Sequence, residues 1–289
     1  MSESEHLVYA FMDAKSVKEE LDIVNKLILL VARESAGFVS VLEHLQPWFA
    51  GDKPDQEITK SMKLIGELLA KVKTLNLTFK QKEILLDFFL RRLRKLVFVD
   101  SASKCFEILY CNYLMSSDTE SADLGFKKLI ELLEGEYWLT SAYVQPIRHR
   151  IYNCLHTLLK QHIELVQGKE MVFVKMVLDH TNEERDPRNL FVILNIWQQV
   201  LFNFDKDKMK MFADSIFDTL SIYFPIIFKN KSSTSAITVD DLNIALNRCL
   251  SHELLVDQFV TLIFSKMSED EEDVRTAALS GLIYILEVS

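Results

Sequence analysis

Histidine and cysteine are the residue types in this sequence best suited to bind a metal ion, and they number seven and four. His149 and His156 lie seven positions apart and could share one face of a helix. However, the sequence contains no His-Glu-x-x-His and no pair of Glu-x-x-His segments, which are spacings by which helices bind metals. We therefore interpret these two histidines as surface residues rather than metal ligands.

The four cysteines are Cys105, Cys111, Cys154 and Cys249. None of them belongs to a Cys-x-x-Cys segment, so local spacing builds neither a zinc site nor an iron–sulfur ligand set. Nor do they form the dense disulfide framework of a small secreted protein. We interpret all four as packing thiols of a reduced chain and predict a protein without a metal or a cofactor.

Charged side chains cluster in three places where either chemistry or helix geometry could explain them. Asp240 and Asp241 could be a metal-binding pair, but a helix is expected to begin there, so we interpret them as capping residues. The acidic run 269–273 is interpreted as a solvated connection, with an acidic ridge for a basic partner as the alternative. The basic segment 91–95 closes a helix and suits its negative end, with a phosphate or nucleic-acid patch as the alternative.

The remaining motifs do not supply a catalytic apparatus. The sequence has no glycine-rich phosphate loop and no Gly-x-Ser-x-Gly nucleophile elbow. Its net charge of −9 is unlike the clustered basic surface that a nucleic acid requires. The apolar run Leu27 to Ala32 is far shorter than the about 20 residues that span a bilayer. We predict a non-enzymatic intracellular protein that contacts neither nucleic acid nor membrane directly.

The scarcity of glycine and proline indicates which elements carry these residues. Seven Gly and five Pro in 289 residues leave little room for hairpins, because these two residue types supply most tight turns. Helix starts are clearly marked: Ser16 with Glu19 and Thr78 with Gln81 fit capping boxes. Strand-like alternation bounded by turn residues is not found. The chain is therefore predicted to be all-α.

The predicted helices fall into pairs. After a helix at about 17–34, pairs are expected at about 36–49 with 55–74, 79–97 with 101–115, 121–134 with 146–167, 170–181 with 187–204, 206–224 with 239–250, and 252–267 with 271–288. Successive pairs start about 43, 42, 49, 36 and 46 residues apart. These intervals bracket the period of about 40–47 residues of HEAT and armadillo repeats.

Hydrophobic patterns support the pairing. Segment 190–202 has little polar face, as expected for an inner helix between neighbouring repeats, whereas the stripe within 255–263 is narrower and suits an outer helix. The sequence Asp-Val-Arg-Thr-Ala-Ala at 273–278 resembles the second helix of a HEAT repeat. Because no pair can bury its apolar side alone, stacking must supply the core. We predict a right-handed α-solenoid of about six HEAT-like helical hairpins.

Four short segments from residue 140 onward occur in an order typical of a known family. They are Ile151-Tyr152-Asn153, Asp186-Pro187-Arg188-Asn189-Leu190, Tyr223-Phe224-Pro225-Ile226 with Phe228, and Asp241-Leu242 followed by Leu246 and Leu250. With them the chain resembles the amino-terminal domain of methyl-methanesulfonate-sensitivity protein nineteen. That family is the HEAT-repeat scaffold of cytosolic iron–sulfur protein assembly, and it is also linked to nucleotide excision repair and transcription.

The resemblance implies a non-catalytic adaptor found in the cytoplasm and nucleus. Family members join a β-propeller subunit and a small cluster-handling subunit in a targeting complex, which presents apo-proteins such as DNA helicases and polymerases for cluster insertion. Among the matching residues, Arg188 is expected to pair with a neighbouring repeat rather than to face a client. The alternative is an unrelated helical-repeat binding module, such as a transport or cytoskeletal adaptor, and copurifying proteins would distinguish the two.

The domain organisation follows from the repeats and the resemblance together. Residues 1–289 are predicted to be an amino-terminal HEAT-repeat domain, with a leading helical segment at 1–35 and stacked helix pairs at 36–289. The polar segment 229–236 is expected to be a flexible loop. Apolar residues lie just before Ser289, whereas terminal repeats need a polar cap, so we expect a piece of a longer solenoid.

Overall fold

The structure, a computed structural model, describes residues 1–34, 37–49, 53–73, 75–116, 118–135, 138–227 and 237–288. Within these ranges the chain is helical and contains no strand, which confirms the predicted all-α class. Contacts divide the chain into two compact units, Met1–Leu132 and Leu133–Ser289, and each is described by itself. The loop expected at 229–236 lies outside the described residues.

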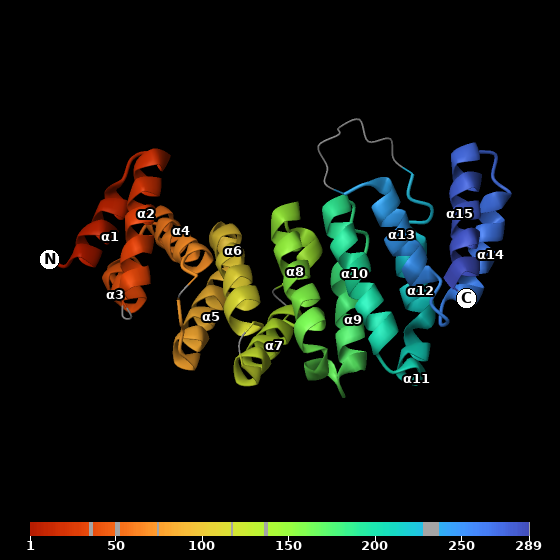
Figure 1. Ribbon diagram of the computed structural model, residues 1–289, viewed down its shortest axis with the longest axis horizontal. Coiled ribbons are helices and arrows are strands. Elements are labelled where there is room, and N and C mark those ends of the chain that lie inside the picture. Colours follow the sequence, from red (N-terminus) through yellow and green to blue (C-terminus); the bar gives the residue numbers. More distant parts are fainter. Residues whose placement is uncertain are drawn as a thin grey trace. The chain divides into compact units, whose positions relative to one another are not determined.

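The α-helices of the first unit are α1 (Glu3–Asp13), α2 (Val17–Arg33), α3 (Gly37–Leu45), α4 (Asp55–Lys71), α5 (Phe79–Leu93), α6 (Val99–Leu109) and α7 (Thr119–Leu133, ending at the boundary). A π-helical turn, Tyr110–Leu114, continues α6. The second helices of the pairs lie next to one another, α2 against α4 and α4 against α6, while α5 packs on α6 (Figure 1). This is the contact pattern of a helical-repeat array.

The α-helices of the second unit are α8 (Gln145–His162), α9 (Glu170–Thr181), α10 (Pro187–Asn203), α11 (Lys206–Met209), α12 (Ala213–Ser221), α13 (Val239–Leu250), α14 (Val256–Met267) and α15 (Glu272–Val288). The second helices again form the row, with α10 between α8 and α13 and with α13 next to α15. No helix in the described ranges is both long and apolar enough to span a bilayer.

The helix boundaries agree with the sequence prediction to within a few residues, with two differences. The helix expected at about 206–224 is broken into α11, a 3-10 turn at Lys210–Phe212, and α12. The leading segment contains a second helix, α1, which packs on α2 and α3. Ser2 caps α1 in a full capping box with Glu5. The predicted array of paired helices is confirmed, and α1 with α2 forms a further pair ahead of the predicted ones.

Side-chain caps mark several of the helix starts, including predicted ones. The side chains of Thr78 and Gln81 form a full capping box at α5, and the Ser16 hydroxyl accepts from the Glu19 amide at α2. Thr238 and Asp241 make the same reciprocal pair at α13. Each cap satisfies backbone donors that the helix itself leaves unpaired, so these residues fix where their helices begin.

Burial follows the predicted faces of the second unit. Trp197 on α10 is fully buried, as are Ile196 and Val200 beside it, because α8 and α13 cover two sides of α10. On α14, Phe259 and Ile263 are fully buried and the rest of the helix is more exposed. The inner and outer assignments of these two helices are therefore correct.

Candidate protein-interaction site

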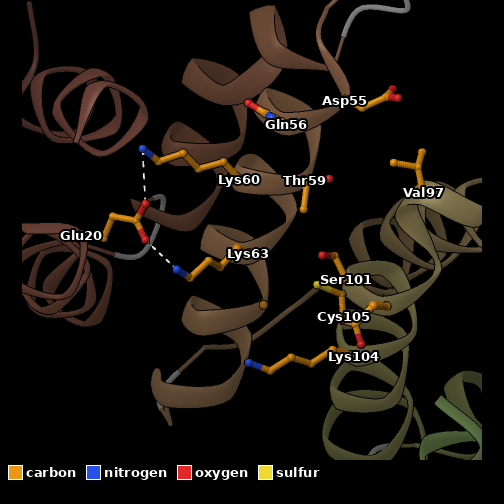
Figure 2. Close-up of a pocket in the computed structure, with 12 residues that line it drawn as sticks. Glu20, Asp55, Gln56, Thr59, Lys60, Lys63, Val97, Ser101, Lys104 and Cys105 are labelled. Carbon is orange, nitrogen blue, oxygen red and sulfur yellow. Dashed lines mark hydrogen bonds and ion pairs between the residues drawn. The ribbon is translucent and has the colours of Figure 1, made fainter. Parts of the chain in front are cut away.

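A groove of about 510 Å³ opens in the first unit where α2, α4 and α6 lie next to one another (Figure 2). The contribution of α4 is Asp55, Gln56, Thr59, Lys60, Lys63 and Gly66. Each of these residues has another of the set three or four positions away, which puts them on one helix face. From the neighbouring elements come Glu20 of α2 and Val97, Asp100, Ser101, Lys104 and Cys105 in and before α6. We refer to these residues as the first groove.

Glu20 joins the α2 wall of the first groove to α4. Its two carboxylate oxygens lie 3.3 Å from the Lys60 Nζ and 2.6 Å from the Lys63 Nζ (Figure 2). Burial by itself raises the pKa of Glu20, but the hydrogen bonds and charges of the two lysines outweigh it, so the pKa lies below its ordinary value. Glu20 is therefore ionised at neutral pH.

Lys60 also makes hydrogen bonds to the end of α1. Its Nζ donates to the carbonyl oxygens of Met12 at 3.0 Å and of Ala14 at 2.7 Å. These carbonyls end α1, where the helix dipole is negative and favours a cation. Lys60 thus ties α1, α2 and α4 together, and its charge is already matched within the protein.

The other wall of the first groove is held by Glu67, which accepts from Lys104 of α6 at 3.2 Å and from Lys71 of its own helix at 2.8 Å. Below this contact, α4 and α6 approach closely at Gly66. A Cβ atom built on Gly66 would lie 2.9 Å from the Cys105 Sγ, so only glycine fits without displacement of the Cys105 side chain. The Cys105 thiol is buried and donates to the Met62 carbonyl at 3.2 Å.

The first groove is suited to contact with another protein. Three lysines and three carboxylates line it, so its charges balance and offer neither a basic nor an acidic surface. Its one thiol is buried and packs between helices. Val97, more than half exposed, adds an apolar contact at the rim. Such a mixed, partly apolar concave surface is typical of a binding site rather than of a reaction centre.

His149 and His156, which were expected at the surface, are both half-buried. Cys105, Cys154 and Cys249 are buried, and Cys111 is partly exposed. The His149 Nδ1 lies 2.9 Å from the Asn189 Oδ1. In the part of the chain that the structure describes, no three His, Cys, Asp or Glu side chains come together as a metal-binding group. The absence of a metal and of a cofactor stays a prediction.

Asp241 and Arg92, from two of the charged clusters, interact with residues of their own helices. Asp241 caps α13, as predicted, while Asp240 is exposed. In segment 91–95, the Arg92 guanidinium carbon lies 3.5 Å from the centre of the Phe88 ring, and its Nη1 donates to the Phe88 carbonyl. Burial lowers the pKa of Arg92, and the nearby charge of Arg91 lowers it further. Arg92 is therefore folded onto its own helix rather than directed at a phosphate.

A buried ionic network in the second unit was not predicted from the sequence. The Glu184 side chain is 1% exposed and accepts from the Arg148 Nε and Nη2 at 2.8 and 2.7 Å and from the Asn189 Nδ2 at 2.9 Å. Arg148 belongs to α8 and Asn189 to α10, so this network joins successive repeats. The expectation for Arg188 was wrong, because its guanidinium pairs with Asp186 in its own helix cap, at 2.9 Å.

A family described as "Dos2-interacting transcription regulator of RNA-Pol-II" matches residues 43–288. The Schizosaccharomyces pombe "DNA repair/transcription protein mms19" is 23% identical over 291 residues, covering 99% of this chain and 27% of the relative. The Dictyostelium discoideum "MMS19 nucleotide excision repair protein homolog" is 26% identical over 223 residues, which cover 76% of this chain and 19% of the relative. The chain thus spans about a quarter or less of these relatives.

Among solved structures, a computationally designed armadillo repeat protein for modular peptide recognition aligns with this chain at 11% identity and a TM-score of 0.43. The alignment covers 98% of this chain and 99% of the designed protein.

Proposed function

The chain belongs to the MMS19 amino-terminal family of Dos2-interacting transcription regulators of RNA polymerase II, as the sequence resemblance predicted, and from this premise we propose that it is a non-catalytic scaffold of the cytosolic iron–sulfur targeting complex. In this role it helps to deliver clusters, which are its cargo, to apo-proteins of DNA replication, repair and transcription. The observation that carries the proposal is the family match over residues 43–288.

The physical character of the described residues supports an adaptor. The polar groups between second helices serve packing: Glu20, Glu67 and Glu184 each join neighbouring helices through ion pairs. The side chains of the first groove are of mixed charge and partly apolar, which suits protein contact. A helical-repeat array offers such contact over an extended surface, because each repeat adds its own strip of second-helix residues.

The partners proposed for this role are proteins. They are a β-propeller subunit and a small cluster-handling subunit of the targeting complex, with iron–sulfur helicases and polymerases as clients. We propose no direct contact with nucleic acid or membrane and no resident cofactor, and we place the protein in the cytoplasm and nucleus. The nuclear location is supported by the names of the relatives in Schizosaccharomyces pombe and Dictyostelium discoideum, which refer to DNA repair.

The proposal treats residues 1–289 as the amino-terminal HEAT-repeat part of a longer scaffold. Support comes from the relatives, of whose length the chain spans only 27% and 19%. In a repeat array each repeat contacts only its neighbours, so a set of amino-terminal repeats can fold without those that follow. Contacts with the assembly subunits are assigned to repeats beyond residue 289.

The test is affinity purification of the longest native form of the chain from its own cells, followed by mass spectrometry. The proposal expects a β-propeller subunit, a small cluster-handling subunit and iron–sulfur enzymes in the eluate at 0.15 M salt. Tagged residues 1–289 serve as the matched bait. Recovery of transport or cytoskeletal proteins in place of assembly subunits would contradict the proposal.

A further inference from the structure

A second groove, of about 710 Å³, lies in the second unit and is lined by α13, by α15 and by Ile226 and Ile227. We refer to it as the α13–α15 groove. Its α15 wall combines the small side chains of Ala277 and Ser280 with the aromatic ring of Tyr284. On the α13 wall, Ile244 is 57% exposed to solvent although it is a large apolar residue. Among the residues that the structure describes, none covers the Ile244 side chain fully, so the groove presents an apolar surface there.

One side chain of the α13–α15 groove already binds the backbone of another segment. The Asn243 Oδ1 accepts from the Ile226 amide at 3.2 Å, and the Asn243 Nδ2 donates to the Ile226 carbonyl at 3.0 Å. A carboxamide that pairs with the amide and the carbonyl of one residue imitates the edge of a β-strand. The groove thus contains a working example of peptide recognition by an asparagine of α13.

Asn247 lies one helical turn further along the same face of α13 and also lines the groove. Its side chain is 6% exposed, and its Oδ1 is buried without a hydrogen-bond partner. A buried acceptor without a partner costs about 1–3 kcal/mol of desolvation, so a ligand that donates a hydrogen bond to it is favoured. Asn247 can offer a partner the same carboxamide that Asn243 gives to Ile226.

The spacing of the two asparagines fits an extended peptide. Four residues of α-helix rise by about 6 Å, so Asn243 and Asn247 are about one turn apart. In an extended chain, residues that point their amide and carbonyl to the same side recur every two positions, about 6.6–6.8 Å. Because Asn243 is already paired with Ile226, Asn247 is the carboxamide of α13 that a partner strand can meet, one such step further along the groove.

The charge of the α13–α15 groove selects among peptides. Asp240 and Asp273 are its two charged lining residues, both exposed and both in the first turn of their helices. Among the residues that the structure describes, no Lys or Arg lines this groove. The surface is therefore complementary to a basic side chain, while Ile244 suits an aliphatic one.

We propose that the α13–α15 groove binds an extended peptide segment of a partner protein in which basic and aliphatic residues alternate. Asn247 reads the peptide backbone through its carboxamide, Ile244 contacts the aliphatic side chains, and Asp240 and Asp273 attract the basic ones. This inference goes beyond the targeting-complex role and does not depend on it, since it concerns the chemistry of one groove.

The test is fluorescence anisotropy of residues 1–289 with a fluorescein-labelled (Lys-Val)5 peptide, and with (Glu-Val)5 as the opposite-charge probe. The groove predicts saturable binding of the first peptide and none of the second. In Asn247→Leu the backbone contacts are lost, and we expect affinity to fall by about tenfold. The melting temperature of this variant should not fall, because the change removes an acceptor that had no partner.

Charge variants separate the groove from the general attraction of a cationic peptide to an acidic protein. In the double variant Asp240→Asn/Asp273→Asn, the affinity for (Lys-Val)5 should fall several-fold, and its dependence on salt should weaken. The matched control is Asp257→Asn, which removes an exposed first-turn carboxylate from α14, outside the groove. Its affinity should equal that of the unaltered chain. These exposed positions also keep the test decisive if Asn247→Leu does not fold.

Three results would overturn the inference. The first is the lack of saturable binding of (Lys-Val)5, and the second is equal affinity of Asn247→Leu, folded, and the unaltered chain. The third is a dimer of residues 1–289 in sedimentation that Asn247→Leu dissociates, since the occupant would then be a second copy of the chain.

Discussion

Replacement of Glu184 by alanine removes the acceptor at the centre of the buried network that joins α8 to α10. Its carboxylate accepts from Arg148 twice and from Asn189, and also from the backbone amides of Arg185 at 2.9 Å and Asp186 at 3.0 Å. Without it, the Arg148 charge and these donors lose their partner in a site that is closed to water on the Glu184 side.

The expected loss of unfolding free energy follows from the burial of Glu184 and Arg148. Removing one member of a buried pair costs about 3–5 kcal/mol, because the other charge is left uncompensated. The Arg148 side chain is 20% exposed and also donates to the Tyr143 carbonyl at 2.7 Å, so it can be partly rehydrated. We therefore expect Glu184→Ala to lower the free energy of unfolding of the second unit by about 3 kcal/mol.

The assay must report the second unit alone, since the two units can unfold separately. Of the three tryptophans, Trp48 lies in the first unit and Trp138 and Trp197 in the second. Urea unfolding followed by tryptophan fluorescence in a Trp48→Phe background therefore isolates the second unit. A cost below about 1 kcal/mol would show that the network is solvated and would refute the reasoning.

Two further variants make the measurement specific. In Glu184→Ala combined with Arg148→Ala no uncompensated charge remains, so the double variant should be less destabilised than the sum of the single ones. The matched control is Glu253→Ala, which removes an exposed ion pair with Lys206 in the same unit. This control should leave the unfolding free energy almost unchanged.

Three other predictions concern packing, pH and metal content. Trp197→Ala should destabilise the second unit by about 3–5 kcal/mol, since this fully buried side chain would leave a cavity; a urea midpoint close to that of the unaltered chain would place it at the surface. Burial lowers the pKa of His156, His180 and His252 below the ordinary histidine value of 6.5, so the unfolded chain takes up protons first as the pH falls. Stability should be full above about pH 6.5 and decrease below it, and an equal unfolding free energy at pH 7.5 and 5.5 would contradict this. Elemental analysis should find no stoichiometric zinc or iron in residues 1–289; bound metal that is lost on replacing any two cysteines would overturn that expectation.

The helix order could be predicted because the signals are local. Caps such as Thr78 with Gln81 mark helix starts within four residues, and few glycines or prolines interrupt the hydrophobic pattern. The missed helix α1 had the same signal in Ser2 with Glu5. The break between α11 and α12 has no comparable mark, because the sequence there remains compatible with a continuous helix.

The candidate sites could not be predicted in the same way. Glu20 and Lys63 are 43 positions apart and look like ordinary surface residues until α2 and α4 pack together. Glu184 stands two residues before a recognisable cap, yet only the fold brings Arg148 to it. Asn243 and Asn247 carry a weak signal, since both interrupt an apolar helix at a spacing of four. Whether such a residue has a partner depends on contacts that no local pattern records.

The central claim is that this chain is part of an adaptor, and the most direct test compares two baits. Residues 1–289 and the longest native form of the chain are used side by side to capture purified β-propeller and cluster-handling subunits. Because linked sites lose effective concentration when they are separated, we predict that the long form captures both subunits and that residues 1–289, though folded, capture neither in stable amounts. Equal capture by both baits would place the assembly site within these repeats, and capture by neither would contradict the adaptor role.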